Sequence, residues 1–385
     1  MSSDETDVLV SNMKKLIPDL GKTFHPVKLS KMDSFDMLSM AQRRQINVKL
    51  QGPTGSGKTT IYEAYCQKTK QPHFVANMKG STTSEELIGA FVPNDEKGSD
   101  VKYVWKDGVI VRAVKYSNIT KEVNVTKSED DTGKIRYEYE LEEGYEIDIQ
   151  RNGEIAPEDI IKTNKEDNTL VVKAWPLCTL TIEEINFSPE ELMSVWFSLL
   201  DIRRNIVLNE KNGEVYKSGK FLSVNATMNP DYIGTNPLNE ALNDRFLIKL
   251  NVEYDKKVEN KLIIERAKEF DMHVNDIQFI KKFVNYVRKA KAEERIDNNI
   301  STRMIEAFMT IKGNFGEDIA QTSLINAFSE EDESTIKQLF DTAKAESNTI
   351  DLNSSELDGI DLSTFKGYQP QIKATRAKRK TKPPF

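Results

Sequence analysis

Apolar positions along the first half of the chain fall into short runs separated by helical spacing. Residues 46–51 and 72–76 are predicted to be strands, and between them a glycine-rich loop leads into a helix from about Thr59. Residues 82–90 are predicted to form a turn and a short helix. Further strands are predicted at residues 169–175, 177–182 and 220–226. Strands that alternate with helices indicate a parallel α/β sheet covered by helices.

The segment that begins at Ser188 has the signals of a helix start. Ser188 is a suitable cap, Pro189 suits the first helical position, and Glu191 completes a capping box. The apolar stripe expected on this helix comprises Leu192, Val195, Trp196 and Leu199. We therefore predict a capped helix that packs on the sheet.

From about residue 255 the pattern becomes entirely helical. One face of a predicted helix collects Ile280, Phe283, Val284 and Val287. A second helix is expected to be capped by Ser301, to bury Met304, Ile305 and Phe308, and to stop at Gly313. An all-helical segment after an α/β domain predicts a helical lid.

Residues 117–170 have a different pattern. Side chains at 135, 137, 139 and 141 are apolar or aromatic between charged neighbours, residues 142–144 interrupt, and positions 145, 147 and 149 resume the alternation. This predicts a β-hairpin with one apolar face. The segment holds seven basic and fifteen acidic residues, and so accounts for the chain's net charge of −7. We interpret it either as a docking or pore-facing element or as a surface excursion.

The whole sequence of 385 residues is long enough for two domains. We expect a leader at 1–27, an α/β nucleotide-binding domain at 28–252 with the insertion at about 117–170, a helical lid at 253–345 and a flexible tail at 346–385. The absence of an 18-residue apolar run and of a signal layout predicts a cytoplasmic protein that does not enter a membrane. Cys66 and Cys178 form no disulfide framework, and three scattered histidines suggest no metal cluster.

A phosphate-binding loop is the most specific motif. Residues 52–59 match G-x-x-x-x-G-K-[ST] between a predicted strand and a helix. Glycines allow backbone N–H groups to surround phosphates, and the helix start adds positive potential. Lys58 is expected to reach the β and γ phosphates, and the Thr59 hydroxyl to bind Mg²⁺. The predicted nucleotide-binding residues are Gly52, Pro53, Thr54, Gly55, Ser56, Gly57, Lys58, Thr59 and Thr60.

Two carboxylates end the predicted strand at 177–182. In P-loop ATPases the first acid at such a strand end holds Mg²⁺ and the second polarises the attacking water. These positions are Glu183, where Asp is usual, and Glu184. We predict Glu183 as a metal ligand with Thr59, and Glu184 as the general base; the alternative is a strand that ends in surface charge.

Six ordered motifs resemble the MoxR-type AAA+ ATPases, a group that includes the CbbQ/NirQ-like, GvpN-like and CobS-like proteins and the AAA modules of dynein-related proteins, with a phage-borne member as one possibility. The matching segments are the phosphate loop, Thr83 to Gly89, Trp105 to Ala113, Glu183 to Asn186, Ala226 to Pro230 followed by Gly234–Thr235 and Leu238 to Phe246, and Ser301 to Arg303. The resemblance implies a P-loop AAA+ domain with a central parallel sheet flanked by helices, a β-rich insertion and a C-terminal helical lid.

The resemblance also implies roles for three further residues. Asn229 matches the sensor that orients the lytic water, Arg245 matches an arginine directed to the next subunit's γ-phosphate, and Arg303 matches the second sensor on the lid. An ion pair within the subunit is the alternative for Arg245, and a surface arginine at a helix start is the alternative for Arg303. Tyr103 and Trp105 resemble part of a hairpin that faces the pore or packs on itself.

What the resemblance implies about function is a magnesium-dependent ATP hydrolase that works as a homo-oligomer, expected to be a hexameric ring. Such a ring remodels a partner protein, often one with a von Willebrand A-type domain, or assists metal insertion. The alternatives are a nucleic-acid-associated motor and a slow-turnover nucleotide-bound scaffold. A basic tail at Lys373, Arg376, Lys378, Arg379, Lys380 and Lys382 either binds nucleic acid or an acidic partner or aids solubility.

Overall fold

The computed structural model describes residues 10–21, 28–29, 31–94, 102–164, 166–230, 238–347 and 365–367. Most of the predicted leader, the motif residues Gly234 and Thr235, and the basic tail lie outside these ranges. The chain divides into two compact units, Met1–Glu253 and Tyr254–Phe385. No helix among the described residues is both long and apolar enough to cross a membrane.

A five-stranded parallel sheet forms the centre of the first unit, with the strand order β16-β3-β15-β12-β4. Its strands are β3 (Val48–Gln51), β4 (His73–Asn77), β12 (Cys178–Glu183), β15 (Leu222–Met228) and β16 (Ile248–Asn251). The strands β12 and β15 are buried at nearly every position. A parallel sheet covered on both faces requires such continuous apolar runs.

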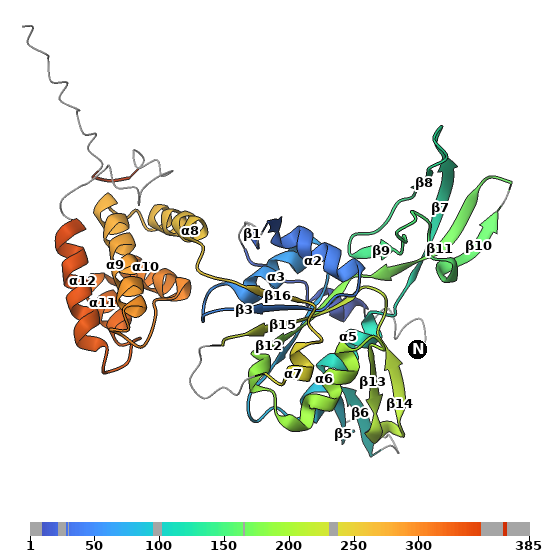
Figure 1. Cartoon of the computed structure of the whole chain (residues 1–385), viewed down its shortest axis with the longest axis horizontal. Helices are drawn as coiled ribbons and strands as arrows, with labels where there is room; N and C mark the ends of the chain where they lie inside the picture. The colour runs from blue at the N-terminus through green and yellow to red at the C-terminus, as the bar shows by residue number, and fades with distance from the viewer. Residues whose placement is uncertain are drawn as a thin grey trace, which may run out of the picture. The chain divides into compact units, whose positions relative to one another are not determined.

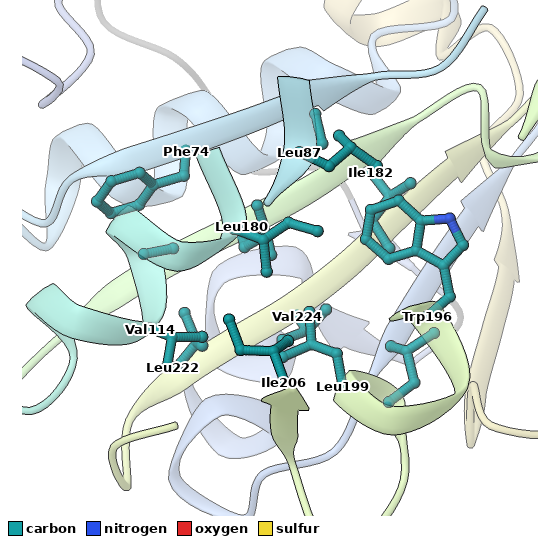
Figure 2. Close-up of a cluster of buried hydrophobic side chains, with 14 of the residues drawn as sticks. Phe74, Leu87, Val114, Leu180, Ile182, Trp196, Leu199, Ile206, Leu222 and Val224 are labelled. Carbon is teal, nitrogen blue, oxygen red and sulfur yellow. The ribbon is translucent and has the colours of Figure 1, made fainter. Parts of the chain in front are cut away.

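Helices cover both faces of the sheet (Figure 1). On one face, α2 (Ser34–Arg43) and α3 (Lys58–Lys68) pack on β3 around Leu38, Ile61 and Tyr62. On the other face, α5 (Val109–Tyr116) and α6 (Met193–Leu200) bury a larger cluster, in which Leu180 lies between Phe74 and Trp196 (Figure 2). The predicted fold class, a central parallel sheet flanked by helices, is confirmed.

Two antiparallel ribbons extend this unit beside α5 and α6 (Figure 1). One is β5 (Gly89–Pro93) with β6 (Tyr103–Asp107), preceded by the short helix α4 (Ser84–Leu87); the other is β13 (Asn205–Leu208) with β14 (Glu214–Lys217). Trp105 stacks edge-on against Phe91, and the Lys211 ammonium lies 5.6 Å from its ring. Trp105 therefore packs within the ribbon, whereas Tyr103 is exposed. A small ribbon of β1 (Lys28–Leu29) and β2 (Met32–Asp33) precedes α2.

The insertion is a second sheet, antiparallel throughout, with β9 and β10 along one edge of β11. Its strands are β7 (Lys121–Glu129), β8 (Ile135–Glu138), β9 (Tyr145–Ile147), β10 (Ile160–Asn164) and β11 (Thr169–Pro176). Alternate residues of β11 are buried, and they form a small core with Val125, Tyr145 and Ile147. The β-rich character and the single apolar face that the sequence predicted are present.

The predicted pairing within this insertion is wrong. The two alternating runs were expected to form one hairpin, but β8 pairs with β7 and β9 pairs with β11. The run at 135–138 follows β7 through a turn and pairs with its polar end, residues 126–129, whereas Tyr145 and Ile147 of β9 join the small core beside β11. Ile149 is partly exposed and forms only an isolated bridge with Ile155.

Two helix signals were also misread. Ser188 does not cap a helix; its hydroxyl accepts a hydrogen bond from the Trp196 indole at 2.7 Å, and α6 begins only at Met193 after a short 3-10 turn. Gly313 does not end its helix, which continues to Phe315. A Cβ at Gly313 would lie 2.4 Å from the Phe270 ring, so this glycine permits close packing.

The second unit is entirely helical in its named elements. It contains α8 (Lys256–Glu269), α9 (Val274–Ala292), α10 (Thr302–Phe315), α11 (Glu317–Ile325) and α12 (Glu333–Ser347). The aromatic rings of Phe279, Phe283, Phe308 and Phe340 meet in its core, with centroids 4.6 Å apart for Phe279 and Phe340. Ser301 caps α10 through a hydrogen bond from the Met304 amide, as predicted.

Candidate nucleotide-binding site

Three parallel strands end together at one edge of the central sheet. The strand β15 lies between β3 and β12, with Met228 opposite Gln51 and Ala226 opposite Ile182. The ends of these strands and the segments that follow them contain the phosphate loop, Asn229 and the two glutamates. Because carboxyl ends of parallel strands meet at the same edge, residues more than a hundred positions apart in sequence share one site.

The phosphate loop is held against the neighbouring strands by its backbone. The Gly52 amide donates to the Met228 carbonyl at 3.1 Å, and a Cβ at Gly52 would lie 2.2 Å from the Val252 carbonyl oxygen. Gly57, at φ +88°, caps the start of α3 in the left-handed region. Only glycine adopts both arrangements without strain.

Lys58 is buried at the start of α3. Its ammonium donates to the carbonyl oxygens of Gly52 and Pro53 at 2.8 and 2.9 Å, which places the charge inside the loop. Thr59 and Thr60 follow in the first turn and are half-buried. A lysine enclosed by a loop at a helix start is the arrangement that recognises β and γ phosphates.

Glu184 has a backbone conformation that is rare outside glycine. Its φ and ψ are both 51°, in the left-handed region, and its amide donates to the Thr227 hydroxyl at 3.2 Å. Its Oε2 atom is buried and has no hydrogen-bond partner among the described residues. Local strain of this kind costs on the order of 1–3 kcal/mol and is concentrated at functional sites, as are orphaned buried oxygens.

The chemistry of the neighbouring oxygen atoms fits Mg²⁺. Burial raises the pKa of the Glu63 carboxyl, and the nearby Glu183 carboxylate raises it further. Glu63 lies one helical turn beyond Thr59, so the two residues share one face of α3. Hydroxyl and carboxylate oxygens suit a hard cation that retains waters and phosphate ligands. Within the described ranges, His, Cys, Asp and Glu form no group of three able to hold a metal alone.

Asn229 links the turn after β15 to the phosphate loop. Its side-chain amide donates to the Thr54 hydroxyl at 2.7 Å, and its carbonyl accepts from the Asn186 amide at 3.2 Å. Asn229 and Asn186 are both buried. The three strand ends are therefore connected by hydrogen bonds that end at the loop.

Arg245 lies at the opposite edge of the sheet from the phosphate loop. It follows α7 (Glu240–Asn243) and precedes β16, and its carbonyl accepts from Asn47, the residue before β3. At about 3.3 Å per residue, the five residues from Asn47 to Gly52 span roughly 16 Å, more than an arginine side chain covers. The guanidinium donates to the Ala241 carbonyl and lies 4.6 Å from the Phe197 ring.

A family comparison identifies this arrangement. The model of the AAA domain, dynein-related subfamily, matches residues 47–246, which is just over half of the chain. The chain belongs to the dynein-related AAA family. The match spans the phosphate loop, the glutamate pair, Asn229 and Arg245, and also includes the inserted sheet.

Relatives of this AAA protein include an uncharacterized protein of Staphylococcus epidermidis, 25% identical over 257 residues that cover 66% of this chain and 73% of the relative. An uncharacterized protein of Staphylococcus aureus is 26% identical over 208 residues, which cover 54% of this chain and 56% of the relative. Among solved structures, a putative ATPase from Cytophaga hutchinsonii aligns at 15% identity and a TM-score of 0.38, covering 88% of this chain and 95% of that chain.

Sequence reasoning missed a buried network that fixes the Arg245 segment of the AAA domain. Asn47 donates to the carbonyls of Leu200 and Arg245 at 2.8 and 3.0 Å, and its oxygen accepts from Arg204 at 3.0 Å. Asn47 and Arg204 are each 4% exposed. A polar residue inside the predicted strand at 46–51 was the available signal.

The second buried contact to this segment comes from β3 itself. Lys49 is 3% exposed, and its ammonium donates to the Asn243 side chain at 2.8 Å. Burial, together with the charge of Lys249, lowers the pKa of Lys49. In the AAA domain these contacts tie the end of α7 to the amino-terminal edge of β3.

Arg303 belongs to the helical unit and is exposed near the start of α10. The preceding Thr302 hydroxyl donates to Glu259 at 2.7 Å, and Glu259 also accepts two hydrogen bonds from Arg288 at 2.6 and 2.7 Å. Glu259 is 5% exposed, so this network fixes the helix start that presents Arg303. The role of Arg303 stays a prediction.

Proposed function

We propose that the protein is a magnesium-dependent ATP hydrolase that assembles into a hexameric ring, in which each active site is completed by the neighbouring subunit. The observation that supports a shared site most directly is the place of Arg245. Its own phosphate loop is at the other edge of the sheet, and its segment is fixed there by Asn47 and Lys49. An arginine held away from its own nucleotide is suited to a neighbour's.

The proposed chemistry divides among the residues at the carboxyl edge. The backbone of residues 52–57 and the Lys58 ammonium bind the phosphates, and Thr59 with Glu183 holds the cation. Bound Mg²⁺ would neutralise charge on the phosphate oxygens. Glu184 accepts a proton from the attacking water, and Asn229 orients that water. Arg245 stabilises charge on the transferring phosphoryl group from the next subunit.

More specifically, we propose that the protein is a MoxR-like ATPase that remodels a partner in the cytoplasm. Hydrolysis at a shared interface displaces neighbouring subunits, and the ring would transmit that movement to a partner protein, for which a von Willebrand A-type domain is the proposed class. We propose that residues 28–252, with their insertion, act as the motor domain and residues 253–345 as the lid. ATPase rates measured with and without DNA or RNA separate this function from a nucleic-acid motor.

A mixing experiment tests the shared site. Arg245→Ala should bind ATP but lose turnover by roughly 10³-fold, as expected for an arginine supplied in trans. Mixed with Lys58→Ala protein, it should regain activity because each variant contributes the half-site that the other lacks. Arg203→Ala, at an exposed arginine paired with Asp201 near the same segment, is the matched control and should retain turnover. Mixed rings that assemble but stay inactive at every ratio would exclude the assignment in trans.

A further inference from the structure

Two buried polar side chains join the turn after β12 to the end of β15, and the proposed chemistry gives neither of them a role. Thr227 lies in β15, two residues before Asn229. Asn186 lies in the short 3-10 turn that follows β12, two residues after Glu184. Each of them is therefore two positions from a residue that we assign to the hydrolytic step.

The backbone pairing of the two strands stops before it reaches these residues. The ladder between β12 and β15 ends with the pair Ile182 and Ala226. The next residue of β12, Glu183, is opposite Asn77 of β4. Beyond this point the ladder no longer fixes the distance between the two chain segments, so side chains must do so.

The first side-chain contact fixes the backbone of Glu184. Leu180 and Ile182 belong to the core beneath α5 and α6, and a regular strand would direct residue 184 to the same face. The left-handed conformation of Glu184 breaks this alternation. That conformation is unfavourable for a residue with a Cβ atom. The Thr227 hydroxyl accepts from the Glu184 amide at 3.2 Å and thereby stabilises it.

The second side-chain contact fixes the backbone of Asn229. The Asn186 side-chain amide donates to the Asn229 carbonyl at 3.2 Å. The Asn229 side chain in turn donates to the Thr54 hydroxyl of the phosphate loop at 2.7 Å. Asn186 therefore connects the turn that contains the proposed base with the residue that reaches the loop.

We propose that Asn186 and Thr227 are positioning residues for hydrolysis. They hold Glu184 and Asn229 at a fixed separation across the ends of β12 and β15. A base and an orienting amide act together on one water only when both are held in one geometry. This inference rests on the ATPase function proposed above. Neither hydrogen bond involves Lys58 or the backbone of the loop, so ATP should bind without them.

Substitutions at Thr227 separate the hydroxyl from the packing of the side chain. Thr227→Val removes the acceptor and should lower kcat at least ~10-fold, while ATP affinity stays within about threefold. Thr227→Ser restores the hydroxyl and should recover kcat to within about threefold of wild type. Thr181→Val, at a buried threonine of β12 whose hydroxyl bonds His73 at 2.8 Å, is the control and should keep kcat within about threefold.

A double-mutant cycle tests whether Asn186 acts through Asn229. Asn186→Ala should lower kcat at least ~10-fold with ATP affinity kept, and Asn186→Leu, which preserves the buried volume, should show the same loss. The double variant Asn186→Ala, Asn229→Ala should turn over within about twofold of Asn229→Ala alone, because the second substitution already removes the residue that is positioned.

Asn225 provides the matched control for Asn186. It is also buried, and the Oδ1 atoms of both asparagines have no hydrogen-bond partner among the described residues. Its amide, however, bonds Ser223 within β15 and does not cross to the other turn. Asn225→Ala should therefore keep kcat within about threefold. Phosphate release at saturating ATP with Mg²⁺ measures kcat, and equilibrium binding of labelled ATP measures affinity.

Several outcomes would overturn the proposal. Wild-type kcat in Thr227→Val and Asn186→Leu would show that the hydrolytic geometry does not depend on these contacts. Equal losses in the control variants would reduce the effect to stability. Fully additive losses in the cycle would show that Asn186 acts apart from Asn229. Wild-type turnover by both Asn229→Ala and Glu184→Gln would instead refute the proposed function, and this inference with it.

Discussion

The two sheets of the first unit use their strands in opposite ways. The central sheet is parallel, its strands are buried on both faces, and its functional candidates lie beyond the strand ends. The inserted sheet is antiparallel, and its strands alternate between buried and exposed residues. One sheet is a platform for chemistry and the other offers a surface.

The difference follows from how the strands of each sheet pair through their backbone hydrogen bonds. In the central sheet β16 and β4 are the two ends of the strand order, and the loops after β3, β12 and β15 are free to hold Lys58, Glu184 and Asn229. In the inserted sheet β8 pairs with only the last four residues of β7, from Thr126 to Glu129. The ends of parallel strands collect side chains at one edge of a sheet.

The largest expected effect comes from removing the charge in the central site. Lys58→Ala should weaken ATP binding at least ~100-fold, because the ammonium enclosed by the loop opposes the phosphate charge. Equilibrium binding of labelled ATP measures it. Lys68→Ala, at the exposed end of the same helix, should bind ATP normally. Normal ATP binding by Lys58→Ala would contradict the assignment of residues 52–59 as the phosphate-binding loop.

A smaller effect is expected at the opposite edge of the central sheet. Asn47→Ala leaves the buried carbonyls of Leu200 and Arg245 without a donor and should cost about 1–3 kcal/mol of unfolding free energy. Turnover should fall roughly 10-fold, corresponding to about 1.4 kcal/mol, while ATP affinity is kept. Asn225→Ala, a buried asparagine bonded to Ser223, is the control. Equal losses of turnover in both variants would show that Asn47 acts through stability alone.

The smallest expected effect on ATP binding comes from deleting the inserted sheet, which tests whether the two sheets function independently. Replacing residues 120–175 with a short Gly/Ser linker removes almost all of β7 to β11. A deletion that ended at residue 168 would keep β11 and expose its apolar face to solvent. ATP affinity should change less than about twofold, since the nucleotide site has its own core, and partner capture should weaken. Binding and ring assembly by light scattering measure this. Loss of assembly would show that the insertion is a structural part of the ring.

The central site could be predicted from sequence because its motifs are local. Eight consecutive residues define the phosphate loop, and each strand end is marked by an adjacent apolar run. The pairing inside the insertion could not, because β9 pairs with β11, the last strand of the insertion, while β8 pairs with the end of the strand that precedes it. Gly313 was misread for the same reason, since its neighbour Phe270 is distant in sequence. Ser188 matched a local rule but bonds Trp196 instead.

The most direct test of the ATPase account is turnover by Glu184→Gln. The substitution removes the base but keeps the shape of the strained turn, so ATP binding should stay within about threefold and phosphate release should fall at least ~100-fold. Glu191→Gln, at an exposed glutamate in the next turn, should turn over normally. Phosphate release measured at saturating ATP with Mg²⁺ decides the matter. Slow release with intact binding is the predicted result; wild-type release by Glu184→Gln would contradict the account.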